Sequence, residues 1–477
     1  MSRINTNVSS LIAQRVLSQN NQALSTSLER LSTGLKINRG ADDPAGLIAS
    51  EALKAEQTGI NQAISNANQA TNVIGTAEGG LNEVSNLLNQ LDGLVNQSAN
   101  SGALSPDEVS ANQLQVDSIL STINRIAGTT AFQGAKLLNG NLDYTTSSVA
   151  ASAFSALQVN AAALPGNKTE AVVVQVTNSA TQGQLTFTGT AAGGKDYAGA
   201  SAVTLEVAGA KGTEQLSFAG SSTLSSITAA INNTSSVTGV TASANGTALT
   251  FIASDYGSKN YVSVRSISGT FAVTGGTSGK AFGKDAAVLV NGAVAQADGK
   301  NVTYRNSALD LDFILSSGLN SGKTKTFGIT GGGATFALGA QVTETDKASL
   351  GIQSVSTGSL GNASVGFLNS LGSGGSNDMS AASLTGAQGI VDKAISQVAS
   401  LRGRLGAFQK FTLGSTINAL NVAYENVSSS ESAIADTDFA HETAALTRAQ
   451  ILQQSATTVL AQANAVPQSA LTLLRNA

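Results

Sequence analysis

Apolar residues recur at every seventh position between Ile60 and Val95, and most are followed three positions later by a second apolar residue. The first set is Ile60, Ala67, Ile74, Leu81, Leu88 and Val95, and the second is Ala63, Ala70, Ala77, Val84 and Leu91. This spacing places one apolar stripe along one side of an α-helix and is typical of helices that pack lengthwise against each other. The segment is therefore predicted to be a long helix in a rod-like bundle.

A second stripe with the same three-and-four spacing lies near the other end of the chain. It comprises Val391, Ala394, Val398, Leu401, Leu405, Phe408, Thr412, Ser415, Ala419 and Val422. Burial of each large side chain contributes about 1.5–3 kcal/mol, which favours packing of the two stripes against each other. The alternative is that each stripe packs within its own bundle. We name nine of the large residues of the two stripes the rod seam: Ile60, Ile74, Leu81, Leu88, Val95, Val398, Leu401, Leu405 and Phe408.

Weaker apolar stripes occupy the two extreme ends. The residues expected to pack between subunits are Leu17, Leu24, Leu28, Leu31, Leu35, Leu452, Val459, Val466, Leu471 and Leu474. Pro467 is expected to kink or end the last helix. The other faces carry mainly Gln, Asn, Ser and Thr, and isolated helices of this kind are marginal in water. Both ends are therefore expected to be largely disordered in a free monomer and to fold against other copies, which circular dichroism can test.

Local signals divide the chain further. Ser105, Pro106 and Glu108 form the pattern of a capping box with proline at the first helical position, and Asp43 with Pro44 marks another helix start. Residues 141–345 alternate apolar and polar side chains in short runs, with an Asn291-Gly292 hairpin signal and one helical insert over 224–231.

These patterns predict an α+β multidomain fold, in which both chain ends form a long antiparallel coiled-coil-like bundle around a β-rich central insert. We expect a terminal helical domain (1–40 with 435–477) and a rod domain with a small β-hairpin part (44–164 with 329–434). The outer domain (165–328) would form one or two subdomains, including a module at about 200–270.

Composition excludes several functions. The chain has no cysteine, which rules out disulfides and thiolate chemistry. Its net charge of −4, without a basic run, argues against binding to nucleic acid or to a membrane surface. No apolar stretch is long enough to span a bilayer. The first 18 residues contain Arg3, Asn5, Asn7 and Arg15, so we expect no Sec-type signal peptide.

Catalytic and metal-binding constellations are not expected either. His441 is the single histidine, and a zinc-protease helix would need a second one where Ala445 stands. The acid pairs Asp42/Asp43 and Asp436/Asp438 flank predicted helix starts, where carboxylates cap amides. Gly331–Gly333 lacks the Lys-Ser/Thr of a phosphate loop, and Asp310 and Asp312 fit a strand whose acidic residues face water. We predict no enzyme activity and no cofactor.

Both chain ends resemble bacterial flagellin, the subunit of the flagellar filament. The motifs that carry this resemblance are INTN (4–7), LERLSTGLKIN (28–38), ADDPAG (41–46), RAQILQQ (448–454), VLAQAN (459–464), VPQ (466–468) and LLR (473–475). Residues 132–138 and 350–356 resemble the segments that flank the family's outer domain. Residues 223–254 are similar to an insert module of flagellins and hook-associated proteins.

The resemblance implies a structural subunit that polymerises with identical copies into the extracellular flagellar filament and serves motility. It also implies type III export of the unfolded chain, followed by folding on assembly. Implied partners are an export chaperone at about 435–477 and the cap and hook-associated proteins. The outermost helices would line the filament channel, and the central zone would face the medium.

Flagellins are also recognised by an innate Toll-like receptor, through the segment that matches residues 88–100. Leu88, Leu94 and Gln97 agree with the strongly recognised form. That form has arginines at the positions of Gln90 and Asp92, and an Arg cannot be exchanged conservatively at a site that uses its charged fork. The resemblance therefore implies weak receptor binding.

Three alternatives remain at this point. A hook–filament junction protein shares the terminal architecture. Deletion of the gene separates the two: loss of the filament with intact hooks indicates a filament subunit, and secretion of unpolymerised flagellin indicates a junction protein. An enzyme could be lodged in the insert, although the absence of histidine before residue 441 excludes a zinc protease there. The insert could also be adhesive or O-glycosylated, which an intact-mass measurement would decide.

Overall fold

The computed structural model describes residues 6–100, 102, 104–164, 169–188, 202–220, 222–306, 308–363, 365–380 and 384–475, with side chains except at 470, 471 and 473–475. The chain forms two compact units. The first consists of Met1–Gln69, Ala337–Asp346 and Lys410–Ala477, and the second of Ala70–Phe336 and Lys347–Gln409. Each unit thus combines segments from distant parts of the sequence.

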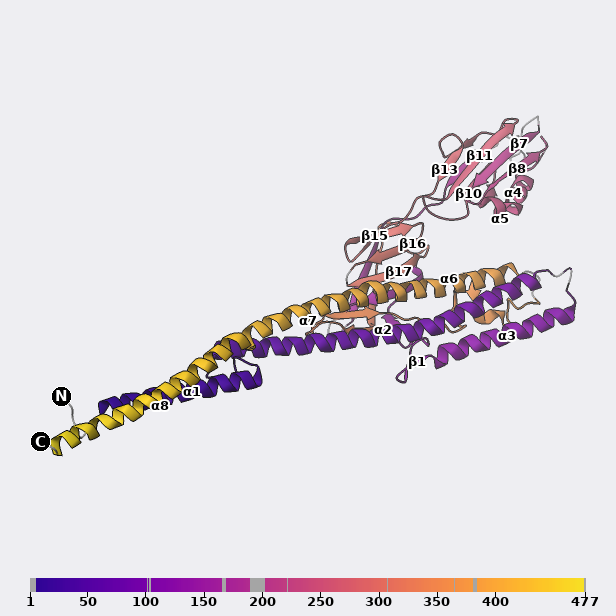
Figure 1. Cartoon of the computed structure of the whole chain (residues 1–477). Coiled ribbons are helices and arrows are strands. Elements are labelled where there is room, and N and C mark those ends of the chain that lie inside the picture. Colours follow the sequence, from indigo (N-terminus) through magenta and orange to yellow (C-terminus); the bar gives the residue numbers. More distant parts are fainter. Residues whose placement is uncertain are drawn as a thin grey trace. The chain divides into compact units, whose positions relative to one another are not determined.

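Helices dominate the first unit. They are α1 (Val8–Thr33), the first half of α2 (Pro44–Ser98), α7 (Gly414–Ala435) and α8 (Phe439–Arg475). Helices α1 and α8 lie side by side (Figure 1). The loop at Ala337–Asp346 packs directly on α2: a Cβ on Gly59 would lie 2.6 Å from the Ala340 carbonyl oxygen. Glycine is therefore required at this position for the close approach of the loop.

Helix starts follow the predicted capping signals. Helix α2 begins at Pro44, and the Asp43 carboxylate accepts a hydrogen bond from the Gly46 amide at 2.9 Å. Helix α3 (Pro106–Thr129) begins with a complete capping box between Ser105 and Glu108. Both predicted starts are confirmed, because each satisfies amides that the helix itself leaves unpaired.

The second unit contains an antiparallel helical rod, built from the second half of α2, α3 and α6 (Thr385–Ala407). The Arg402 guanidinium donates to Glu78 at 2.8 Å, and the Gln388 amide donates to Asp92 at 2.6 Å. Residue numbers thus rise along α2 while they fall along α6. Seven rod-seam side chains of this unit are at most 2% exposed: Ile74, Leu81, Leu88, Val95, Val398, Leu401 and Leu405.

A π-helix over Phe408–Leu413 interrupts the helical run after α6. The ring of Phe408 is half-buried and lies 6.1 Å from that of Phe336. Leu413 is fully buried, whereas Ser415 and Val422 are exposed. The predicted continuation of the stripe through Thr412, Ser415, Ala419 and Val422 is therefore wrong. A π turn holds more residues than an α turn, which rotates all later side chains around the helix axis.

Eight antiparallel strands form the inner sheet of the second unit. In sheet order they are β3 (Tyr144–Ser147), β18 (Thr324–Gly332), β5 (Glu170–Asn178), β14 (Ala287–Val290), β15 (Ala293–Asp298), β16 (Asn301–Arg305), β17 (Leu309–Leu315) and β4 (Phe154–Ala162). The Tyr144 hydroxyl donates to the Ala162 carbonyl at 3.2 Å, so the two edge strands meet. Phe154 packs edge-on against Phe313 and Phe327 in the core.

A second β structure, which we name the outer module, lies between residues 184 and 282. Its two sheets have the orders β12-β6-β10-β9 and β13-β11-β7-β8. The strands are β6 (Gln184–Thr188), β7 (Val203–Gly209), β8 (Thr213–Phe218), β9 (Val240–Asn245), β10 (Ala248–Ala253), β11 (Tyr261–Ser268), β12 (Val273–Thr274) and β13 (Lys280–Phe282). Helices α4 (Leu224–Asn233) and α5 (Ser235–Thr238) complete it. Its own apolar core includes Leu205, Ile227 and Phe251.

Short elements connect these parts. They are β1 (Ala131–Phe132), β2 (Ala135–Lys136), β19 (Ala334–Ala337), β20 (Lys347–Leu350), β21 (Gly361–Asn362), β22 (Gly366–Phe367) and the 3-10 helix η2 (Leu368–Leu371). The predicted hairpin is confirmed, since Asn291 and Gly292 both have positive φ, at 50° and 84°. The predicted fold class is also confirmed: helical ends enclose a β-rich insert. Within the described residues, no helix has the length and apolarity needed to cross a membrane.

Candidate functional site: the paired terminal helices

The contact between α1 and α8 is made by small side chains. On α1 the buried residues are Ser10, Ala13 and Ser27. On α8 they include Ala449, Ala456 and Ala463, which are spaced seven residues apart and therefore lie along one line of the helix. Small side chains let two helix backbones approach closely. They also bury little apolar surface, so this pairing alone contributes modest stability.

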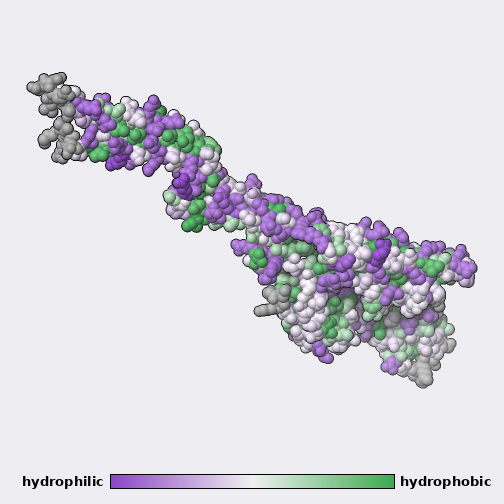
Figure 2. Space-filling model, turned by 90° about the horizontal axis from the view of Figure 1, so that it is seen from below, coloured by the Kyte–Doolittle hydropathy of each residue, from purple (hydrophilic) through white to green (hydrophobic). Residues whose placement is uncertain are grey.

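Many of the large apolar side chains of the two helices are exposed instead. Those between 38% and 60% exposed are Val8, Leu11, Ile12, Val16, Leu28, Phe439, Ile451, Leu452, Val459 and Val466. Figure 2 shows hydrophobic patches along these helices, interspersed with hydrophilic side chains. Contiguous exposed apolar surface on a soluble chain marks a contact with another molecule.

Polar bonds fix the register of the pair. The side chain of Asn7, the N-cap of α1, donates to the Ala463 carbonyl at 2.7 Å, and the Ser10 hydroxyl donates to Asn464 at 2.7 Å. Further along, Gln453 donates to Asn21 at 2.9 Å, and Arg30 lies 3.7 Å from the buried Glu442 carboxylate. Because the buried alanines are nearly alike, these bonds distinguish the observed register from one shifted by a turn.

Backbone pairing joins the inner ends of the two helices. Gly34 ends α1 in the left-handed conformation, with φ at 75°. The Lys36 amide then donates to the Ala435 carbonyl at 2.7 Å, and the Thr437 amide donates to the Gly34 carbonyl at 2.9 Å. Position 34 takes glycine readily because a Cβ is disfavoured at this φ.

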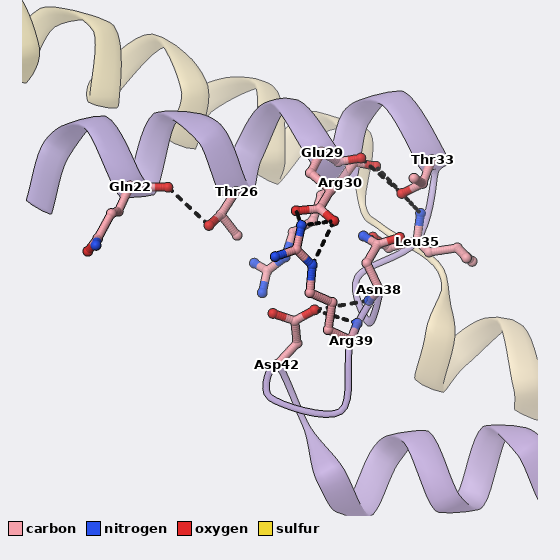
Figure 3. A network of polar contacts seen from close by, with 9 residues as sticks. All are labelled: Gln22, Thr26, Glu29, Arg30, Thr33, Leu35, Asn38, Arg39 and Asp42. Atoms are coloured by element: carbon pink, nitrogen blue, oxygen red, sulfur yellow. Dashed lines mark hydrogen bonds and ion pairs between the residues drawn. The ribbon is translucent and has the colours of Figure 1, made fainter.

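A compact polar turn follows α1 (Figure 3). The Asp42 carboxylate accepts hydrogen bonds from the amides of Asn38, at 3.0 Å, and Arg39, at 2.9 Å. The Arg39 guanidinium in turn binds Glu29 with two nitrogens. The amides of Arg39 and Asn38, together with the positive charges of Arg30 and Arg39, lower the pKa of the Asp42 carboxyl.

Acid titration should therefore loosen this turn only at low pH. A carboxyl with a lowered pKa stabilises the fold above its ordinary value of 3.8, and that contribution is lost as the pH falls through the lowered folded-state value. We expect the Asp42 carboxyl resonance to titrate below 3.8, with parallel shifts of the Asn38 and Arg39 amides. In D42N those amides should lose this titration. A midpoint at or above 3.8 would contradict the assignment.

The predicted packing residues fall into three groups in this structure. Leu28, Leu452, Val459 and Val466 are exposed, whereas Leu17, Leu24, Leu31 and Leu35 are partly buried. The side chains of Leu471 and Leu474 lie outside the described residues. Helix α8 runs through Pro467, so the helix does not end there. The buried small residues of α1 were not predicted, although the spacing of the alanines in α8 signals such a contact.

The residues considered for catalysis or metal binding make contacts typical of structural residues. His441 is exposed, and its amide donates to the Asp438 carboxylate, which caps α8. Asp310 and Asp312 do not simply face water: both accept hydrogen bonds from the Asn160 amide, at 3.0 and 2.8 Å. Among the residues that the structure describes, no group of three or more His, Asp or Glu could hold a metal ion.

The predicted receptor segment lies on the second half of α2. Leu88 is fully buried within the rod seam, and Leu94 is partly buried. Gln90 and Gln97 are exposed. At these two glutamines, the segment thus exposes polar side chains that carry no charge.

Comparison with known proteins connects these features. The helical region at the N-terminus of bacterial flagellin matches residues 4–143, and the helical region at its C-terminus matches residues 388–474. The flagellin hook IN motif matches residues 203–255, within the outer module. The B-type flagellin of Pseudomonas aeruginosa is 30% identical, over 99% of both chains. The chain belongs to the bacterial flagellin family.

A second flagellin agrees with this assignment. Flagellin D of Vibrio anguillarum is 31% identical, over 99% of both chains. Domains of the flagellar cap protein of Escherichia coli are 22% identical over 39% of this chain and 96% of that chain, with a TM-score of 0.28. As a flagellin, the chain is a structural subunit of the bacterial flagellar filament, and the family is structural in its role.

Proposed function

We propose that copies of this flagellin polymerise through the outward faces of the paired helices α1 and α8. The supporting observation is the inversion of side-chain size in this pair: small residues are buried between the helices, and large apolar residues are exposed. A stable isolated helix pair would place its large residues inside. Neighbouring copies would supply the missing partner for the exposed face, and the ends would fold fully only on assembly.

Substitution of Val459 by aspartate tests this proposal. Val459 is 59% exposed, so V459D should leave the stability of the monomer unchanged. In a filament contact, the carboxylate would be buried without a partner at a cost of several kcal/mol. Because each ~1.4 kcal/mol changes an equilibrium tenfold, we expect the critical concentration for assembly to rise beyond the measurable range in a pelleting assay.

The matched control is Q454D. Gln454 is also exposed on α8, and it lies about 140° around the helix from Val459 at 3.6 residues per turn. The Q454D substitution introduces the same charge on the polar side of the helix, so we expect this variant to assemble nearly as well as the parent. If V459D polymerises as well as Q454D, the exposed apolar face is not the contact.

We further propose that the chain acts outside the cell after export in an unfolded form. Helices with little buried apolar surface unfold at low cost, which suits passage through a narrow export channel. An export chaperone would bind residues 435–477, whose exposed apolar side chains need cover before assembly. Cap and hook-associated proteins would be partners at the growing and basal ends.

We propose that the chain is divided into three domains. Residues 1–40 with 435–477 would form the filament core, and residues 44–164 with 329–434 the surrounding rod. Residues 165–328 would face the medium as the outer domain. The end of α1 at Thr33 and the start of α8 at Phe439 support the first boundary.

We propose weak recognition by the innate Toll-like receptor and no enzymatic role or cofactor. Gln90 is exposed and Asp92 is partly exposed, and neither presents the cation that the strongly recognised form has at these positions. A reporter assay beside a strongly recognised flagellin tests this, and an equal response would refute it. For catalysis, His441 is exposed, and its neighbour Asp438 already accepts a hydrogen bond from the His441 amide as a helix cap.

A further inference from the structure

The outer module is joined to the inner sheet by two crossings of the chain that pair with each other. The Thr181 amide donates to the Lys284 carbonyl at 2.9 Å, and the Lys284 amide donates back to Thr181 at 3.0 Å. The Gly257 amide adds a bond to the Thr181 carbonyl at 3.2 Å, and the Gly283 amide adds one to Asn260 at 2.8 Å. A third segment, the loop at 256–260, is therefore bound to both crossings.

The same loop contacts a turn of the inner sheet, residues 298–300, which connects β15 to β16. Asp285 lies between them: its carboxylate accepts from the Ser258 amide at 2.9 Å and from the Gly299 amide at 2.8 Å. The Ser258 hydroxyl also donates to this carboxylate. These donors lower the pKa of the Asp285 carboxyl, and the Ser258 hydroxyl has the largest effect. One side chain thus holds a loop of the outer module against a turn of the inner sheet.

Two charged residues of the turn make further contacts on either side of Gly299. The Asp298 carboxylate binds the Lys259 ammonium group, and the Lys300 ammonium group lies 3.6 Å from the centre of the Tyr256 ring. Exposed ion pairs and cation–π contacts are individually weak. Their placement on both sides of one turn nevertheless restricts its rotation relative to the loop.

The backbones of loop and turn are in direct contact. A Cβ on Gly299, which has φ of +62°, would lie 2.5 Å from the Tyr256 carbonyl oxygen. A Cβ on Gly257 would lie 2.7 Å from the Gly299 amide nitrogen. Both distances are under 3.0 Å, which Cβ atoms essentially never show, so a side chain at either position would push the two segments apart.

We propose that the turn at 298–300 is a docking surface that fixes the orientation of the outer module, so that module and inner sheet move as one rigid body. Two short crossings alone would act as a hinge. The backbone contact at Gly299, the Asp285 bridge and the two flanking charges hold that hinge closed. The outer module would then be presented in one direction on every copy in a filament.

Distance measurement between spin labels on the full-length chain tests this. Because the chain contains no cysteine, K325C at an exposed position of β18 and V237C at an exposed position of α5 would be the only label sites. The parent should give one narrow distance distribution. G299A should lose that narrow distribution, because its Cβ would clash with Tyr256.

The matched control is G292A in the preceding hairpin turn. Gly292 also has a positive φ, +84°, but a Cβ there would meet nothing within 4 Å. It therefore imposes similar backbone strain without touching the loop, and it should keep the narrow distribution. A second variant, D285A, removes the bridge without straining the turn and should also broaden the distribution. A broad distribution in the parent, or narrow ones in both G299A and D285A, would overturn the proposal.

Discussion

A chain that lacks residues 440–477 is expected to remain monomeric under conditions in which the full chain forms filaments. The deletion removes nearly all of α8, and with it Val459 and the other exposed apolar residues of that helix. It also removes the helix against which the Ala13 face of α1 packs. We therefore expect circular dichroism to lose more helix than the deleted residues account for, and electron microscopy to show no filaments. Deletion of residues 1–40 should have the same effect.

The control for this prediction is an internal deletion of greater length. Residues 182–283 can be replaced by two glycines, because Thr181 and Lys284 are already paired through 2.9 and 3.0 Å backbone hydrogen bonds. This variant retains α1, α8 and the rod, and it should still polymerise. The prediction is contradicted if the chain without residues 440–477 forms filaments, or if the chain without the outer module does not. Either result would show that the assembling surface lies outside the terminal helices.

Truncation of Leu81 to alanine should destabilise the folded monomer by about 2–5 kcal/mol, the range for leucines in tightly packed cores. Leu81 is fully buried in the rod seam. Its removal leaves a cavity between helices that neighbouring side chains cannot fill without moving. Urea unfolding followed by circular dichroism measures the change, provided that the variant and the parent are compared as monomers.

The matched control is L114A, on α3. Leu114 is 68% exposed, so the same truncation there should change the free energy of unfolding by no more than about 0.5 kcal/mol. Equal effects at both positions would show that Leu81 does not lie in a packed seam. An effect confined to Leu81 would locate the main stabilising contact of the helical rod at α2.

The helical parts of this fold could be predicted because their signals are local. The heptad spacing around Leu81, the capping box at Ser105 and the Asn291-Gly292 turn each depend on a few neighbouring residues. The order of the eight inner strands could not be predicted, because β5 pairs with β14 and β18, which are more than 100 residues further along the chain. Such pairings depend on packing that no short pattern contains.

The candidate site was predicted only in part, for a different reason. Large apolar residues such as Val459 are easily found in the sequence. Whether they face a helix of the same chain or are left exposed depends on which residues fill the contact between the two helices. Ala456 and Ser10 occupy the contact within the chain. The role of Asn160, which bridges Asp310 and Asp312, was equally hidden, because a polar residue in a strand is usually assumed to face solvent.

The π-helix at Phe408–Leu413 has a consequence for how one helical run can serve two sets of contacts. Before it, Leu401 and Leu405 belong to the buried seam of the rod. After it, the shift in helical phase leaves Val422 at 58% exposure, although plain counting would continue the seam there. The six residues of this π-helix thus move the continuation of a buried hydrophobic stripe to the surface of the subunit. A single irregular turn thus separates a stripe that is buried in the subunit from one that is exposed on its surface.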